Sequence, residues 1–292
     1  LGATGVASAQ PGAEIYVDDD GQDCAATYSS IQTAVNNAAA GDTVVVCDGT
    51  YAEQVRIDKE LTLEVNPGSD VVLVGTTFGA ESNAITVDAN GVVVDGFNVT
   101  DYGTAVNVSN AVDVLVTDVN VTETAEGVDV SATGANIVSN VTVRNSAFDS
   151  VTTGLLFRVN DGAQLNDTTA FRNVINGSDT GILLDDSATP TENRLRTLEV
   201  RQNLITNAGV DGIRATSTTD TTGIRVTRNF FRDNAVAVRN ENEATNLTAW
   251  LNHWGDDSGP SSASGTVTDP RTGAAADGSG DAVSADVNFD PW

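Results

Sequence analysis

The sequence is poor in methionine, histidine, lysine, cysteine and aromatic residues. Its 292 residues include no methionine, one histidine (His253), one lysine (Lys59) and two cysteines, and aromatic residues make up 5% of the chain. So few aromatics exclude a bulky globular core, whereas the 40% of hydrophobic residues can fill an elongated one. We therefore expect one elongated domain.

Positive charge is also scarce, because 41 acidic residues face 14 basic ones and give a net charge of −27. Such a surface repels nucleic acid and anionic membranes, so neither is expected as a partner. No apolar stretch is long enough to span a bilayer, so direct membrane insertion is not expected. The acid-rich, lysine-poor composition resembles that of proteins from extreme halophiles; an ordinary acidic secreted protein is the alternative.

A six-residue phrase recurs seven times between residues 84 and 255, with its last residue 22 to 30 positions apart. An alternating apolar pair, such as Ile85/Val87 or Leu155/Phe157, keeps the same period and follows Gly or Ala in most repeats. Each repeat therefore carries at least two short strands and no crossover helix. The phrases occupy residues 94–99, 116–121, 143–148, 170–175, 200–205, 226–231 and 249–254.

Short strands that repeat without helices can bury their inward side chains only by stacking coil on coil, which predicts an all-β fold, a single parallel β-helix. Four asparagines, Asn173, Asn203, Asn229 and Asn252, fall at the same place in their phrases. Amides one rung (~4.8 Å) apart can form a hydrogen-bonded ladder, and asparagine tolerates the left-handed backbone of a tight turn. We expect a structural role for these four residues.

Both ends of such a solenoid need a cover. A helix is predicted over residues 30–40, with Ser30 as its N-cap, an apolar face that includes Ile31 and Val35, and Gly41 as its stop. At the other end, a strand at residues 283–289 can fold back over the last coil, with Trp254 and Trp292 filling the end of the core, or cross to a neighbouring copy in head-to-tail filaments. The expected single domain is 14–292, with an N-terminal cap and first rungs (14–60), repeated coils (61–255), and a loop and C-terminal cap (256–292).

Several features predict an exported protein at the cell surface or outside the cell. Residues 1–10 resemble the end of a secretory signal, so residues 1–13 are interpreted as a signal-peptide remnant or N-terminal extension. Cys24 and Cys47 predict a disulfide, with a metal-binding pair as the alternative. Glycosylation sequons are consistent with export and occur at Asn98, Asn107, Asn120, Asn140, Asn166, Asn176 and Asn246.

Two stretches resemble right-handed parallel β-helix proteins of the pectin-lyase-like superfamily, and secreted haloarchaeal members in particular. They are YSSIQTAV (28–35), GDTVVV (41–46), DGTY (48–51), VRI (55–57) and KELTL (59–63) near the start, and NHWG (252–255), SGP (258–260) and the closing PW near the end. The resemblance implies a right-handed solenoid with a short N-terminal capping helix and a C-terminal capping strand. It does not fix function, because this scaffold hosts lyases, hydrolases, esterases, adhesins and structural proteins.

Two activities of these relatives find no support in the sequence. The catalytic Gln-Asp and Gly-x-x-Asp-Phe-Ile-Phe-Gly motifs of pectin methylesterases have no counterpart. The resemblance extends to a copper-associated periplasmic branch linked to nitrous oxide reductase, yet a chain with no methionine and one histidine cannot assemble a soft-ligand copper site. His253, beside two tryptophans, is expected in the closing rung rather than as a catalytic base.

The resemblance to polyuronate lyases implies carboxylates for Ca²⁺ and an arginine or lysine base. Aligning the coils places Asp129, Arg158, Asp185 and Arg214 on one outward face. A catalytic site on acidic polysaccharide and a surface ion-pair network are both open interpretations. One predicted column holds Asp129, Leu156, Leu183, Arg214 and Ala237, and the next holds Ser131, Arg158, Asp185, Thr216 and Arg239.

A second candidate Ca²⁺ site is the acidic loop of Asp18, Asp20 and Asp23 around Gly21, which lacks the bidentate glutamate of an EF-hand; a solvated loop is the alternative. Charge is also uneven along the chain. Residues 144–239 hold 11 of the 14 cations and 11 acids, whereas residues 1–143 sum to −19 and residues 240–292 to −8. The neutral band is where an acidic glycan or another copy could approach; the alternative is that arginine is simply used on the broader coils.

Together these features favour a non-catalytic, secreted or cell-surface β-helix of a halophile. We expect it to be structural or glycan-contacting, to assemble with itself, and to need no cofactor, with Ca²⁺ as the one candidate ion. The alternative is a Ca²⁺-dependent polysaccharide lyase or glycoside hydrolase acting on acidic polysaccharide.

Overall fold

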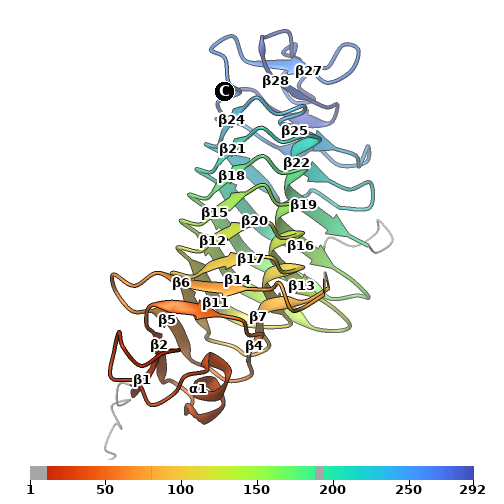
Figure 1. Ribbon diagram of the computed structural model, residues 1–292. Helices are drawn as coiled ribbons and strands as arrows, with labels where there is room; N and C mark the ends of the chain where they lie inside the picture. The colour runs from red at the N-terminus through yellow and green to blue at the C-terminus, as the bar shows by residue number, and fades with distance from the viewer. Residues whose placement is uncertain (1–11, 80, 188–193) are drawn as a thin grey trace, which may run out of the picture.

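The computed structural model describes residues 12–79, 81–187 and 194–292. It is an elongated, right-handed parallel β-helix, as predicted, with the N-terminal cap at one end and the C-terminus near the other (Figure 1). Most of the predicted signal remnant, residues 1–11, lies outside the described residues.

Three parallel sheets, named A, B and C here, form the sides of the solenoid. Sheet A contains β1 (Glu14–Val17), β2 (Thr43–Val46), β5 (Thr62–Val65), β8 (Val93–Asp95), β11 (Val112–Thr117), β14 (Ile137–Arg144), β17 (Gln164–Phe171), β20 (Leu195–Arg201), β23 (Arg225–Thr227), β26 (Leu247–Thr248) and β29 (Val287–Asn288). Sheet B contains β3 (Gly49–Tyr51), β6 (Val71–Val74), β9 (Asn98–Thr100), β12 (Asn120–Thr122), β15 (Ala147–Asp149), β18 (Val174–Asn176), β21 (Leu204–Thr206) and β24 (Phe230–Arg232). Sheet C contains β4 (Val55–Ile57), β7 (Asn83–Val87), β10 (Thr104–Ser109), β13 (Glu126–Ala132), β16 (Thr153–Val159), β19 (Thr180–Asp186), β22 (Asp211–Ala215), β25 (Val238–Asn240), β28 (Gly280–Val283) and β27 (Pro260–Ser262).

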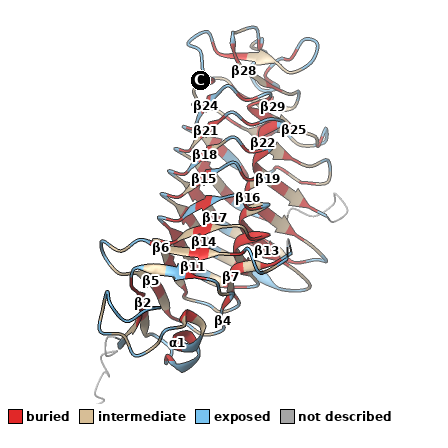
Figure 2. Ribbon diagram, viewed as in Figure 1, coloured by how far each residue is buried: buried red, intermediate tan, exposed pale blue. Residues whose placement is uncertain are grey.

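Each complete coil has three strands, one in each sheet, in agreement with the prediction of at least two. The first six of the recurring phrases each span a turn: their first residues end a strand of sheet A and their last residues form a strand of sheet B. The seventh, 249–254, follows β26 and makes only an isolated bridge from His253 to Phe230. The side chains that face inward are buried along the whole axis (Figure 2). The core is therefore a column made mostly of small and branched side chains, as the composition predicts, with a few buried aromatic rings such as Phe97 and Phe157.

The predicted asparagine ladder is present at the turn between sheets A and B. The Nδ2 atoms of Asn173, Asn203 and Asn229 each donate to Oδ1 of the asparagine in the next coil, at 3.0 to 3.1 Å. Each Nδ2 also donates to a backbone carbonyl of the preceding coil. The left-handed backbone, however, belongs to the residue before each asparagine: Arg172, Gln202, Arg228 and Leu251 have φ of 55° to 57°.

A column of glycines runs beside the inward pairs of sheet C. A Cβ added at Gly127, Gly154, Gly181 or Gly212 would lie 2.3 to 2.7 Å from a carbonyl oxygen of the next coil. Such contact is far closer than packed atoms tolerate, so the close approach of successive coils there requires glycine. This explains the Gly that precedes the apolar pair in these repeats.

The N-terminal cap is the helix α1 (Ile31–Asn37), with Ser30 as N-cap. It ends before the predicted stop at Gly41, because Ala38 is already extended. Two residues that follow the helix hold its ends. The Glu53 carboxylate accepts the N–H groups of the first two helical residues, and Lys59, the only lysine, donates to three carbonyls at the C-terminal end.

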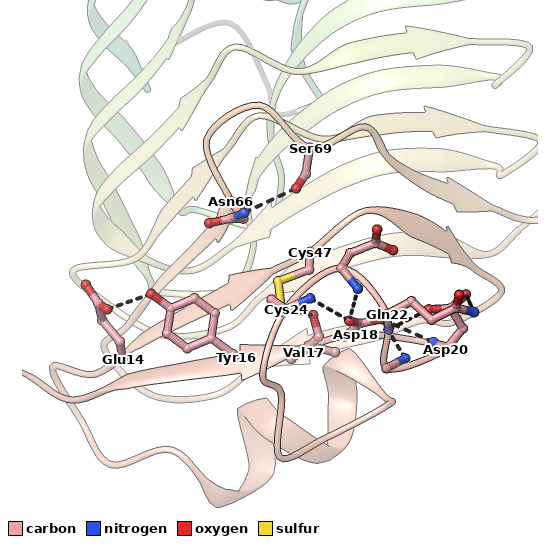
Figure 3. The surroundings of a disulfide bond; sticks show 12 residues. Glu14, Tyr16, Val17, Asp18, Asp20, Gln22, Cys24, Cys47, Asn66 and Ser69 are labelled. Atoms are coloured by element: carbon pink, nitrogen blue, oxygen red, sulfur yellow. Dashed lines mark hydrogen bonds between the residues drawn. A yellow bond between two sulfur atoms is a disulfide. The ribbon is translucent and has the colours of Figure 1, made fainter.

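Cys24 and Cys47 form the predicted disulfide, which ties the loop after β1 to the end of β2 (Figure 3). No helix in the described ranges is long and apolar enough to cross a bilayer.

The C-terminal segment folds back on its own last coils. β28 pairs with β25 and β27 in sheet C, and β29 pairs with β26 in sheet A. Trp254 and Phe289 are fully buried, but Trp292 is 45% exposed, so the expectation that both tryptophans fill the end of the core is wrong for Trp292. Its ring instead lies against Gly259, where a Cβ would come within 2.6 Å of it.

Candidate functional site

The outer face of sheet C carries the predicted polar columns, with one correction. The strand register puts Asp129 opposite Leu156, and Arg158 opposite Asp185. Arg239, however, pairs with Arg214 and belongs to the first column, where Ala237 was expected. The reason is that Asn240 takes the inward position expected to be apolar, where its Nδ2 donates to two backbone carbonyls.

Arg158 is the centre of the cluster. Its guanidinium lies 3.7 Å from Glu126, 3.8 Å from Asp129 and 3.8 Å from Asp185. Glu126 was not predicted as a member; its position at the start of β13, just before Gly127, was the available signal.

Arg214 does not join this cluster. Leu156 and Leu183 occupy the two rungs between Asp129 and Arg214. Arg214 instead pairs with Glu241 at 2.9 Å. Three of the four predicted site residues therefore lie together, and the fourth belongs to a separate ion pair.

Asp129 is the acid of this site whose pKa is most clearly shifted. The residue is only 5% exposed, and this burial raises the pKa of the carboxyl to about 7, an effect that the neighbouring Arg158 opposes and Glu126 reinforces. Oδ2 accepts from Asn107 at 3.3 Å, while Oδ1 is buried with no hydrogen-bond partner. At neutral pH this carboxyl can therefore hold a proton and donate it to an oxygen atom in the cleft.

A cleft of about 280 Å³ lies beside Asp129. Its wall contains three acids and polar groups of the adjacent coils, so a cation or the hydroxyl groups of a sugar are the chemical species that fit it. The lining residues include Glu81, Asn83, Thr104, Asn107, Glu126 and Asp129.

The second predicted Ca²⁺ site has a different composition from the one expected. Among the described residues, the acids whose oxygens lie within 4.8 Å of one another are Asp18, Asp19 and Asp20, without Asp23. Asp18 is buried, and its two oxygens accept four backbone N–H groups of its own loop (Figure 3). These bonds, above all that from Cys24, lower the pKa of Asp18 to about 2. Both oxygens of Asp18 are therefore already used to hold the backbone of its own loop.

The seven sequons differ in exposure. Asn98 and Asn120 face the same way on adjacent rungs of sheet B, as predicted, and Nδ2 of Asn120 donates to Oδ1 of Asn98. Asn107 faces the cleft, where it is hydrogen-bonded to Asp129. The exposed sequon asparagines are Asn120, Asn140 and Asn246, and the partly buried ones are Asn98, Asn107, Asn166 and Asn176.

A family model described as "Periplasmic copper-binding protein (NosD)" matches residues 35–268, well over half of the chain. The chain belongs to the NosD family. A cell surface glycoprotein of Methanothermus fervidus is 28% identical to it over 94 residues, which are 32% of this chain and 15% of that protein. The chain therefore spans a small part of the length of this curated relative.

Solved structures share the fold at low identity. Polygalacturonase from Erwinia carotovora ssp. carotovora has a TM-score of 0.52 and 10% identity, covering 99% of this chain and 96% of the enzyme. An alginate lyase from a Paenibacillus species has a TM-score of 0.50 and 13% identity, covering 88% and 96%. At such identities the similarity extends to the fold alone.

The copper ion implied by the NosD family description does not fit the donors of this chain. Cys24 and Cys47 are joined to each other, so neither offers a thiolate, and the chain has no methionine. His253 lies in the last coil, as predicted, with its ring stacked on Phe230 at 4.4 Å. Its Nδ1 accepts the Gly255 N–H, and its Nε2 lies 3.6 Å from Asp257. A single imidazole leaves copper without the nitrogen and sulfur ligands that it prefers.

Proposed function

We propose that this chain is a non-catalytic β-helix module of a secreted or cell-surface protein of a halophile, with a structural or glycan-contacting role. The observation that carries the proposal is the surrounding of Arg158 by three carboxylates within 3.8 Å. An arginine shared among three acidic side chains is the arrangement of an ion-pair network, in which the guanidinium is engaged with the protein's own acids. The ion-pair interpretation of this face is therefore the better supported one.

Two further observations support the proposal. The chain shares sequence with a cell surface glycoprotein, and its exposed sequons at Asn120, Asn140 and Asn246 can accept glycans. The net charge of −27 with one lysine supports a halophilic source.

The test is an assay for polysaccharide cleavage. The purified chain is incubated with polygalacturonate and with alginate, with and without Ca²⁺, and the absorbance of unsaturated product is followed alongside release of reducing ends. A polyuronate lyase serves as the positive control. We expect neither signal; sustained product formation above a heat-denatured sample would overturn the non-catalytic assignment.

The second candidate is a Ca²⁺-dependent lyase or a hydrolase on acidic polysaccharide, favoured by the buried, unpartnered oxygen of Asp129 in the cleft. In that case Asp129→Asn and Arg158→Ala should abolish turnover with the fold retained by circular dichroism. Arg214→Ala is the matched control, because Arg214 lies outside the cluster and should leave turnover intact. If all three variants lost turnover equally, the loss would not be specific to Asp129 and Arg158, and these residues would not be assigned a catalytic role.

We also propose that self-assembly, if the rod uses it, needs exchange of the C-terminal segment, because residues 283–289 cover their own last coil. Electron microscopy in molar salt, with the intact chain and with residues 283–292 removed, tests this. Filaments that vanish on truncation support exchange, and particles of single-rod size from the intact chain contradict it.

A further inference from the structure

Sheet A carries a cluster of positive charge that lies on a different side of the solenoid from the Asp129 cleft. We name it the arginine face and define it by six residues of β14, β17, β20, β23 and the turns after them: Arg144, Arg172, Arg196, Arg201, Arg225 and Arg228. They are six of the 14 cations of a chain with a net charge of −27. The same four strands contain only two acids, Asp167 and Glu199.

The register aligns this face with the rod axis. Phe171 lies between Arg144 and Arg201 on successive rungs, and Arg225 follows Glu199 in the adjacent column. From the rung of Arg144 to that of Arg225 the face extends three steps, about 14 Å at ~4.8 Å per rung. A ligand that follows it must be an extended one.

Phe171 orients two of the guanidinium groups. Those of Arg172 and Arg201 lie over its ring, at 4.6 and 4.2 Å from the centroid. Arg172 Nε donates one hydrogen bond to Gln202 Oε1, and Arg201 Nε lies 3.4 Å from Glu199 Oε2. Because each guanidinium has five N–H donors, both retain donors for a ligand, in a geometry fixed by the ring.

Four of the six arginines of this face have no salt bridge to a described acid of the chain. Within the described part of the protein, Arg144, Arg172, Arg225 and Arg228 form no salt bridge, and the last three are exposed. The arginines of sheet C differ, because Arg158, Arg214 and Arg239 all lie beside carboxylates. With 41 acids available, the unpaired arginines are a local departure from the charge balance of the molecule.

We propose that the arginine face binds a strand of anionic polysaccharide along the rod axis through guanidinium contacts to carboxylate or sulfate groups. The inference rests on the proposed glycan-contacting function and gives it a location. Guanidinium forks match such anions in bidentate geometry, and the outward hydroxyls of Thr142, Thr169 and Thr227 lie on the same rungs to bond sugar hydroxyls. A second copy fits less well, because it brings its own net charge of −27 to the contact.

The experiment compares two double variants of equal charge change. Arg172→Gln/Arg228→Gln removes two cations from the face, and glutamine suits this turn because Gln202 occupies the same position one coil away with φ of 57°. Arg56→Gln/Arg232→Gln removes two cations from sheets C and B. Binding to polygalacturonate (carboxylate), dextran sulfate (sulfate) and dextran (neutral) is measured by biolayer interferometry at several salt concentrations.

We expect the intact chain to bind one or both anionic polymers and not dextran, with affinity falling as salt rises. The face variant should lose roughly tenfold in affinity, and the control variant should change by about twofold or less. Equal losses in both variants, or self-association that the face variant abolishes, would overturn the assignment of this face. Binding that persists in the face variant but fails in Asp129→Asn would move the glycan to the cleft and leave the proposed function standing. No binding to any anionic polymer by the intact chain would overturn the assignment of this face and the glycan-contacting role, and would leave the structural role.

Discussion

At the scale of single residues, Asn203 shows how a polar group stabilises an apolar column. Its side chain is buried and makes four hydrogen bonds, to the asparagine on each side and to the backbone of Asn173 and Ala170. A buried amide is stable only when its partners are complete, and here the neighbouring coils supply all of them.

Asn203→Ala should therefore be strongly destabilising, since it leaves buried donors and acceptors of two other coils unpaired. We expect a loss of roughly 2–5 kcal/mol in the free energy of unfolding, measured by denaturant titration. Asn37→Ala, at the exposed end of α1, is the control and should cost well under that. Equal effects of the two substitutions would argue against the ladder as a source of stability.

Asp129 predicts a pH dependence. Its folded-state pKa of about 7 lies above the ordinary carboxyl pKa of 3.8, so between these pH values the folded protein holds a proton that the unfolded chain has released. The stability associated with that proton is present below pH ~4 and is lost as the pH rises through about 7. Asp129→Asn should thus gain stability relative to the parent between pH 4 and 8, by on the order of 2–4 kcal/mol.

Thermal melts of both proteins across this pH range measure the difference. Asp18→Asn is the contrast: its folded-state pKa of about 2 is lowered, so the parent carries an advantage above pH ~4 that fades as the pH falls through about 2. If the stability difference between Asp129→Asn and the parent did not change with pH, the pKa of the Asp129 carboxyl would not be raised in the folded protein.

At the scale of elements, the glycine column fixes how closely the strands of sheet C approach. Gly154→Ala would put a methyl group 2.6 Å from the Gly181 carbonyl and 2.8 Å from Ile175. We expect a loss of about 1–3 kcal/mol, seen as a lower melting temperature. Gly79→Ala has no atom within 4 Å of the new methyl and an ordinary φ, so it should be neutral or slightly stabilising. A neutral Gly154→Ala would mean that the coils can move apart without cost.

The N-terminal cap depends on a covalent link and two ionic groups. Reduction of Cys24–Cys47, or Cys24→Ser/Cys47→Ser, should loosen α1 and cost on the order of 2–4 kcal/mol in stability. Hydrogen exchange should rise first in α1 and β1, with the repeated coils protected as before. Uniform loss of protection along the rod would instead mean that the cap and the coils unfold as one unit.

The sequence predicted the elements that repeat and missed those that depend on distant contacts. The period of about 25 residues placed the asparagines of the ladder, because stacking of similar coils puts equivalent residues together. Glu53 and Lys59 contact α1 from the following coil, and no local sequence pattern predicts such contacts. The position of Arg239 was predicted wrongly because the inward Asn240 looks polar in sequence but is bonded inside the solenoid. Column alignment correctly grouped Asp129, Arg158 and Asp185. It missed Glu126 and wrongly included Arg214, because the reach of a side chain across rungs cannot be read from the register alone.

At the scale of the whole molecule, charge repulsion opposes the compact rod. With 41 acids and 14 cations, lowering the salt lengthens the range of repulsion between carboxylates. The melting temperature should fall from molar sodium chloride to dilute buffer. Sucrose at equal osmolarity does not screen charge and is the control. Unchanged melting across this range of salt would contradict the halophilic assignment.

Because similar coils stack in register, the length of the protein can be counted in rungs. Asn120 pairs with Ala147, and Ala147 with Val174, so neighbouring coils here are the same chain displaced by 27 residues. A gene duplication or deletion of one such unit would insert or remove a rung while leaving the glycine column, the asparagine ladder and both caps in place. Such a protein can be tailored as a molecular ruler, its span changed in steps of ~4.8 Å by recombination between its own repeats.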